Sequence, residues 1–242
     1  MNKDEVFKEH AKPSDFKFTS SVAGVFDDMV NRSVPFYEEI QRMVSELAAD
    51  HATNNSKIYD LGCSTGTTMI YMDQKVAENI PIVGVDDSTA MLEKCRTKLE
   101  AIGTKRTVDL KVSDLNKEIG IENASVVVLC LTLQFVRPMN RERLVREIFN
   151  GLQKEGVLIL VEKILAEDGH FNRDFIKYYY DMKRRHNYSE MEISQKREAL
   201  ENVLVPYKLS ENIALLRDVG FEHCEVFFKW YNFTGIVAKK SL

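Results

Sequence analysis

Features that mark several common protein classes are scarce or missing in this 242-residue chain. It has four cysteines and no Cys-x-x-Cys pair, which argues against a zinc or redox motif and favours reduced thiols. No apolar run approaches the roughly 18–20 residues that span a membrane, and the polar N-terminus lacks the apolar core of a secretory signal. With 33 basic and 37 acidic residues, the net charge of −4 does not mark a nucleic-acid-binding surface. We therefore expect a cytoplasmic protein with no membrane anchor and no metal.

The composition is that of an ordinary globular protein. Hydrophobic residues make up 44% of the chain and charged residues 29%, and a chain of this length can bury a core without disulfides or metals. We find no internal repeat and no low-complexity linker. We expect a single domain over residues 1–242, with an extended lead-in to about residue 20, N-terminal helices at about 20–50 and an inserted helical segment at about 167–205.

Short apolar runs alternate with helix-like stretches in the middle of the chain. Strands are predicted at 57–61, 81–86, 108–112, 125–135 and 156–161, and helices at 88–102 and 140–152. The runs at 224–230 and 233–239 surround a short turn and predict an antiparallel hairpin. Strands joined by helices form parallel, right-handed sheets. The sequence therefore predicts a Rossmann-like α/β fold with a mostly parallel sheet.

A candidate ligand site lies where the first three predicted strands end. Gly62 and Gly66 flank a strand-to-helix junction whose backbone N–H groups can approach a ligand closely. Asp86 ends the second strand, where an acid reaches ribose hydroxyls, and Asp114 follows the third, where a carboxylate can accept from an adenine amino group. Each acid alone also suits a strand-end cap, but together they favour a nucleoside site.

The loop departs from a dinucleotide-binding fingerprint. That fingerprint needs Gly-x-Gly-x-x-Gly, and Ser64 occupies the position of its second glycine. Asp60 adds a carboxylate just before the loop, which suits a cationic amino group better than a phosphate. A nucleoside with an amino-acid-like, positively charged end meets both conditions, and S-adenosylmethionine is such a molecule.

Two sets of motifs resemble known families. Asp60 to Gly66 and Val85 to Ser88 resemble the class I S-adenosylmethionine-dependent methyltransferases, which implies their α/β fold. A second set lies at 31–37, 121–125, 132–135, 187–190, 193–197 and 200–203. These segments resemble the carboxy-S-adenosylmethionine synthases, which implies conversion of S-adenosylmethionine and prephenate to carboxy-S-adenosylmethionine and phenylpyruvate. In that family a second enzyme, a tRNA carboxymethyltransferase, uses the product to build the 5-oxyacetyl group of wobble uridine.

The resemblance also implies site residues. Those that match the family's ligand-binding positions are Tyr37, Gly62, Cys63, Ser64, Asp86, Asp87, Asp114, Leu115, Cys130 and Arg197. Arg197 and Tyr37 are the candidate catalytic residues, because a planar guanidinium can hold a carboxylate through two hydrogen bonds and a phenol can donate to it. In the family this arginine comes from the partner subunit, which implies a homodimer with shared sites.

Two positions depart from the family pattern, and two other functions stay open. Cys130 stands where the family usually has Asn, and Asp87 where Asn is common. A cysteine lacks the donor and acceptor of the amide. The alternatives are a conventional methyltransferase acting on a small molecule or RNA, and a nucleoside-binding protein without catalytic activity. The basic and aromatic stretch at 177–197 is expected to form a solvated helix face with aromatics at a dimer interface, not a nucleic-acid site.

Overall fold

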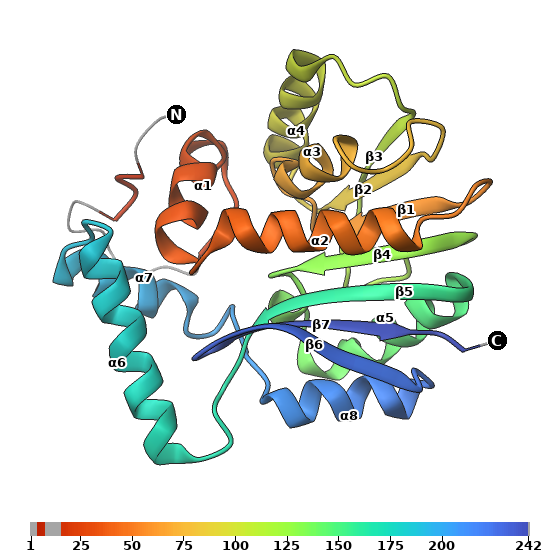
Figure 1. The fold of residues 1–242 in the computed structure, drawn as a ribbon. Helices are drawn as coiled ribbons and strands as arrows, with labels where there is room; N and C mark the ends of the chain where they lie inside the picture. Colours follow the sequence, from red (N-terminus) through yellow and green to blue (C-terminus); the bar gives the residue numbers. More distant parts are fainter. Residues whose placement is uncertain (1–3, 8–15, 242) are drawn as a thin grey trace.

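Seven strands form one sheet in the computed structural model, which describes residues 4–7 and 16–241. The strands are β1 (Lys57–Leu61), β2 (Ile82–Asp86), β3 (Val108–Val112), β4 (Ala124–Cys130), β5 (Leu152–Lys163), β6 (His223–Trp230) and β7 (Phe233–Lys239). Their order is β3-β2-β1-β4-β5-β7-β6 (Figure 1). β1 to β5 pair in parallel, whereas β7 runs antiparallel to β5 and β6. The predicted mostly parallel sheet with a C-terminal hairpin is confirmed.

Helices cover both faces of the sheet. They are α1 (Ser20–Ser33), α2 (Tyr37–His51), α3 (Thr67–Asp73), α4 (Thr89–Ile102), the 3-10 helix η1 (Leu133–Phe135), α5 (Pro138–Gly151), α6 (Gly169–Arg185), α7 (Glu190–Leu200) and α8 (Leu209–Val219). α2, α3 and α4 pack on one face, and α5 and α8 on the other. α1, α6 and α7 lie beyond the end toward which β4 points (Figure 1). No helix of the described residues is long and apolar enough to cross a membrane.

The central strands are buried on both faces because side chains alternate across them. Val126 and Val128 of β4 pack with α2, α3 and α4, whereas Val127 and Leu129 pack with α5 and α8. All four side chains are fully buried. This two-sided burial explains the unbroken apolar run, which is typical of a parallel strand between two helical layers.

Two local predictions are confirmed. The Ser88 hydroxyl accepts a hydrogen bond from the Met91 N–H at 3.3 Å and caps α4 at its N-terminus. α1 ends at Ser33 and α2 begins at Tyr37, so Pro35 does separate two helices. Phe36, just before α2, adopts a left-handed backbone with φ of 52°.

The strand predicted at 125–135 is too long. β4 ends at Cys130, Leu131 turns into the left-handed region with φ of 61°, and η1 follows. The backbone N–H groups of Leu133 and Gln134 donate to the buried Glu162 carboxylate, each at 2.9 Å. Those bonds replace the hydrogen bonds that a longer strand would make in the sheet. The apolar pattern does not predict where β4 ends, because Leu133 is buried as deeply as a strand residue.

Other element boundaries also shift. The helix predicted at 140–152 begins at Pro138, a residue suited to the first helical turn, and Leu152 already belongs to β5. No prediction covers α8. The segment at 167–205 contains two helices, α6 and α7, instead of one long helical stretch. Of the extended lead-in, residues 1–3 and 8–15 lie outside the described residues.

The turn after β1 generates a stability prediction. Gly62 has φ of +76°, and a Cβ there would collide with Thr132 Cγ2, whereas Gly103 has φ of +66° and open space around it. Alanine at either position should lower the free energy of unfolding by about 1–2 kcal/mol, because a left-handed backbone strains a residue with a Cβ. Gly62→Ala should lose a further ~1–3 kcal/mol to the collision. Urea unfolding of the two variants measures the difference.

The cause of that extra loss is checked by a double variant. Thr132→Ala removes Cγ2 and Oγ1, the two atoms nearest the added Cβ, so Gly62→Ala should be less damaging in that background. Equal losses for Gly62→Ala and Gly103→Ala would show that the close approach to Thr132 is unimportant for stability.

Candidate active site

A cavity of about 910 Å³ lies at the carboxyl ends of the parallel strands. Its lining contains all ten residues that the sequence predicted for the site: Tyr37, Gly62, Cys63, Ser64, Asp86, Asp87, Asp114, Leu115, Cys130 and Arg197. They come from α2, the loops after β1, β2 and β3, the end of β4, and α7. Residues spread from position 37 to position 197 are thus brought to one cavity, as expected for an open α/β sheet.

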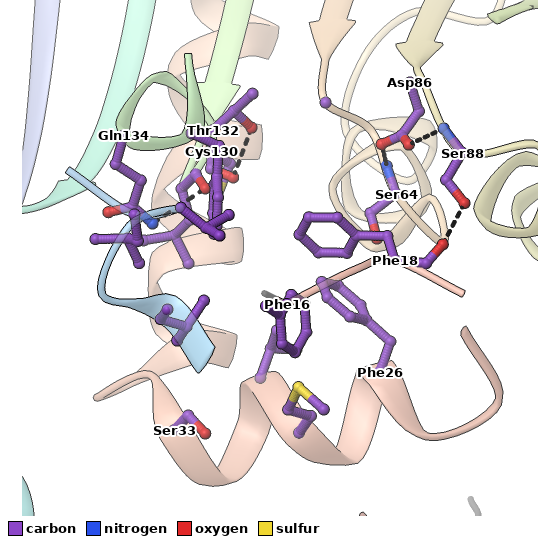
Figure 2. A pocket seen from close by; sticks show the side chains of 18 of the residues that line it. Phe16, Phe18, Phe26, Ser33, Ser64, Asp86, Ser88, Cys130, Thr132 and Gln134 are labelled. Carbon is purple, nitrogen blue, oxygen red and sulfur yellow. Dashed lines mark hydrogen bonds between the residues drawn. The ribbon is translucent and has the colours of Figure 1, made fainter. Parts of the chain in front are cut away.

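The loop after β1 is fixed to the end of β2. The N–H groups of Gly62 and Cys63 both donate to the Val85 carbonyl, at 2.7 and 3.0 Å. One carboxylate oxygen of Asp86 accepts from the Ser64 N–H and the other from the Ser88 N–H, both at 2.9 Å (Figure 2). Burial raises the pKa of Asp86, and these two bonds oppose the rise. The Asp86 carboxylate is therefore held in place and can still accept from hydroxyl groups of a ligand.

Two further carboxylates lie beside Asp86. One oxygen of Asp114 accepts both the N–H and the side-chain amide of Asn116, each at 2.9 Å, and these bonds lower the Asp114 pKa. Partial burial, and next the nearby Asp114, raise the pKa of Asp87. Acceptors concentrated at this edge suit the hydroxyl and amino donors of a nucleoside.

Asp60 carries a buried acceptor without a partner. It is 1% exposed, and among the described residues its Oδ2 atom has no hydrogen-bond donor. Burial, and next the charge of Asp86, raise the pKa of Asp60 to about 7. An ammonium group near the loop would favour the ionised carboxylate. The residues thus fit a nucleoside whose tail carries a cationic amino group.

Burial disfavours the reactive thiolate form of the two cysteines that line the cavity. Burial raises the pKa of Cys130 to about 12, and the adjacent Cys95 together with burial raises that of Cys63. Gln41 donates its amide N–H to Cys130 Sγ at 3.4 Å, while its carbonyl oxygen has no partner among the described residues. Weak contacts of the thiol with Gln41 and Thr68 stand where the family's asparagine would offer both a donor and an acceptor.

The two candidate catalytic residues line the cavity from two different helices, α2 and α7. Tyr37 begins α2, and burial raises its pKa, so its hydroxyl remains protonated and can donate. Arg197 is an exposed residue of α7 that lines the cavity of its own chain. Its guanidinium has no hydrogen bond or ion pair with residues 4–7 or 16–241, so its donors are available for a ligand.

The sequence interpretation missed several residues of the lining. Lys183 and Lys196 are only 5% and 6% exposed, and Tyr179 is 7% exposed. All three line the cavity, so the prediction of a solvated basic face at 177–197 is wrong for them. The charge count across that stretch concealed their position, because only the pitch of α6 separates the inward Lys183 from the exposed Arg184. Phe16, Phe18 and Phe26 add an aromatic wall (Figure 2).

Comparisons with known proteins agree on fold and family. Residues 58–156 match the profile of the family described as Methyltransferase domain. The carboxy-S-adenosyl-L-methionine synthase of Methylococcus capsulatus is 55% identical over 242 residues, covering 99% of this chain and 100% of the relative. The synthase of Sulfurimonas denitrificans is 45% identical over 238 residues, covering 98% and 99%.

Solved structures share the fold at low sequence identity. The YcgJ protein from Bacillus subtilis is 12% identical with a TM-score of 0.64, covering 85% of this chain and 100% of its own. A SAM-dependent methyltransferase from Methanosarcina mazei is 17% identical with a TM-score of 0.56, covering 81% and 97%. The predicted class I methyltransferase-like fold is confirmed.

The buried Asp60 predicts a pH-dependent stability difference. Its folded-state pKa of about 7 exceeds the ordinary value of 3.8, so its contribution to stability is complete below that lower value and is lost as pH rises through 7. An asparagine at this position would imitate the protonated acid at every pH. The free energy of unfolding of Asp60→Asn, measured relative to that of the wild type, should therefore rise by about 2–3 kcal/mol when the pH is raised from 5 to 8.

Urea unfolding at both pH values measures this gain. Asp109→Asn, on the exposed side of β3, is the matched control and should show no such trend. A difference between Asp60→Asn and the wild type that is the same at pH 5 and pH 8 would contradict the raised pKa.

Proposed function

The chain belongs to the family of carboxy-S-adenosyl-L-methionine synthases, and on that premise we propose which reaction its cavity carries out. The substrates are S-adenosylmethionine and prephenate, and the products are carboxy-S-adenosylmethionine and phenylpyruvate. One observation above all supports the proposal: a single cavity combines the acidic nucleoside edge at Asp86 and Asp114 with the unpaired guanidinium of Arg197. A site for plain methyl transfer needs the first feature and has no need of the second.

The reaction balances without an added oxidant or metal. Prephenate loses its ring carboxyl group as carbon dioxide and its ring hydroxyl as hydroxide, and becomes phenylpyruvate. The hydroxide takes a proton from the methyl group of S-adenosylmethionine and leaves as water. The methyl carbon then bonds to the carbon dioxide. No general base from the chain is required, because the leaving hydroxide removes the proton.

The chain's own residues bind, orient and exclude water. In the proposal Asp86 accepts from the ribose hydroxyls, Asp114 from the adenine amino group, and Gly62 lets the backbone approach the amino-acid tail. Asp87, Leu115, Cys63, Ser64 and Cys130 complete the nucleoside pocket. Holding carbon dioxide beside the methyl carbon supplies the proximity that a reaction in solution lacks.

Arg197 and Tyr37 would act on the carboxylate as it forms. A guanidinium can place two parallel N–H donors on one carboxylate, which lysine cannot do. Donors already in place where negative charge develops stabilise the transition state. Arg197 is free of ion pairs within the described chain, and Tyr37 remains protonated, so both can take this role.

The proposal includes a homodimer. Phe171, Tyr178 and Tyr231 are 58%, 40% and 42% exposed. They lie on α6 and the β6–β7 turn, and the rings of Tyr178 and Tyr231 are 4.9 Å apart. This exposed aromatic surface on α6 and the β6–β7 turn supports association of two copies. We further propose a cytoplasmic enzyme whose product supplies the tRNA carboxymethyltransferase acting on wobble uridine, without binding tRNA itself.

The reaction is tested with the purified chain alone. Incubation with S-adenosylmethionine and prephenate should yield a nucleoside heavier than S-adenosylmethionine by one carbon dioxide, together with phenylpyruvate, both detected by mass spectrometry. Omitting prephenate is the control and should leave S-adenosylmethionine unchanged. If prephenate yields no such product while another acceptor becomes methylated, the chain is a conventional methyltransferase.

Arg197 generates a separate prediction. Arg197→Leu should weaken binding of carboxy-S-adenosylmethionine about 10- to 100-fold, because a charge-assisted hydrogen-bonded pair is lost. Affinity for S-adenosylmethionine should change by about twofold or less. Isothermal titration calorimetry with both nucleosides measures the two effects. Arg173→Leu, at an exposed position of α6, is the matched control.

Mixing variants shows which subunit supplies the arginine. Asp86→Ala disables the nucleoside edge, and Arg197→Leu removes the guanidinium. If Arg197 serves the partner's cavity, mixed dimers of the two variants should recover activity that neither has alone. Equal loss of affinity for both nucleosides in Arg197→Leu would contradict a role in carboxylate recognition.

A further inference from the structure

Three lysines line the cavity without a carboxylate in direct contact. Lys163 is the last residue of β5, Lys183 lies near the end of α6, and Lys196 belongs to α7. None of their ammonium groups forms an ion pair with a described residue. Burial lowers the pKa of Lys163 and Lys196 to about 8, and burial together with the nearby Lys196 and Lys163 lowers that of Lys183 well below its usual range. Lys183 and Lys196 are buried and Lys163 is partly buried, and lysines are rarely buried unless something balances their charge.

Lys163 and Lys183 share one aromatic neighbour. Their Nζ atoms lie 4.9 and 4.7 Å from the centroid of the Tyr179 ring. The Lys163 backbone N–H donates to Gln134 Oε1 at 3.0 Å, which ties this lysine to η1. Contact with an aromatic ring offsets only part of the cost of burying an ammonium group. When protonated, the two amines therefore provide positive charge that no described carboxylate compensates directly, and a bound anion would favour that protonated form.

Lys196 differs from the other two. Its Nζ donates to Ser33 Oγ at 2.9 Å, and Ser33 Oγ is 3.2 Å from the Tyr188 hydroxyl. That hydroxyl donates to the buried Asp4 at 2.8 Å. Lys196 thus belongs to a hydrogen-bonded chain that ends on an acid, whereas the Nζ atoms of Lys163 and Lys183 donate no hydrogen bond to any described residue.

We propose that Lys163 and Lys183, which both contact the ring of Tyr179, bind the oxopropanoate carboxylate of the co-substrate, the one that phenylpyruvate retains. The inference rests on the proposed function and adds residues for the second substrate, which the sequence did not provide. Prephenate is a dianion, so its binding needs more positive charge than Arg197 supplies.

The choice between the two carboxylates follows from the chemistry. The ring carboxyl group leaves as carbon dioxide, and an ammonium pair bound to it would stabilise the ground state more than the transition state. Such binding would slow the reaction. The oxopropanoate carboxylate keeps its charge throughout, so Lys163 and Lys183 can anchor it without opposing decarboxylation. Anchoring that end also directs the ring carboxyl group toward the methyl carbon and Arg197.

The test uses the full chain saturated with S-adenosylmethionine and two probes, phenylpyruvate and 1-phenylpropan-2-one, which lacks the carboxylate. Wild type should bind phenylpyruvate at least about tenfold more tightly than the ketone. Lys163→Met and Lys183→Met keep the side-chain length and remove the charge. Both should abolish most of that preference and raise the KM for prephenate about tenfold or more, with affinity for S-adenosylmethionine unchanged.

The matched control is Lys229→Met. Lys229 also contacts an aromatic ring, with Nζ 5.7 Å from the centroid of Phe175, but does not line the cavity. Lys229→Met should change neither the affinity for the two probes nor the KM for prephenate. Thermal unfolding checks the fold, and Lys183→Met should melt no lower than the wild type, because it removes a buried charge without a partner.

Failure of the lysine subsite can be distinguished from failure of the proposed function. If the wild type makes carboxy-S-adenosylmethionine but the lysine variants keep the preference for phenylpyruvate, the lysine subsite is wrong and the proposed function stands. If the wild type makes no carboxylated product, the proposed function fails. Even then, a preference for phenylpyruvate that the wild type shows and the lysine variants lose would support a carboxylate subsite. A wild type without that preference would overturn the subsite.

Discussion

The cavity depends on how tightly the chain turns after β1. Gly62 and Cys63 share the Val85 carbonyl, and Gly62 passes so close to Thr132 that no side chain fits between them. That one close packing aligns the ends of β1, β2 and β4, and it places Asp86 where both of its oxygens are fixed by backbone N–H groups. The position of the acidic residues that would bind the nucleoside therefore depends on the turn after β1 more than on any single acid.

The sequence predicted much of this arrangement and failed at identifiable points. Alternating apolar runs predicted the parallel sheet, and motif positions predicted ten residues that do line one cavity. The strand end at Cys130 could not be read from periodicity, since Glu162 supplies the replacing hydrogen bonds from 28 and 29 residues away. Lys183 was concealed for a related reason. Its neighbour Arg184 is exposed, and only the orientation of α6 against the sheet decides which of the two enters the cavity.

Titratable groups whose pKa values are shifted by burial recur in and next to the cavity. Asp60 and Glu162 have raised pKa values, of about 7 and about 8, and Lys163 has one lowered to about 8. Each lowers the stability of the empty protein near neutral pH. Groups with strongly shifted pKa values gather at functional sites, and here Lys163 lines the cavity while Asp60 and Glu162 lie close to lining residues in the sequence. The same cavity is therefore expected to be more stable when filled than when empty.

A thiol in the pocket of a sulfonium substrate raises a chemical question. Thiolates displace alkyl groups from sulfonium sulfur, so a reactive cysteine at position 130 could consume the methyl donor and become a thioether. Burial raises the pKa of Cys130 to about 12, which disfavours the thiolate that this displacement requires. The raised pKa of Cys130 therefore favours survival of the methyl donor in a cavity whose lining includes a thiol.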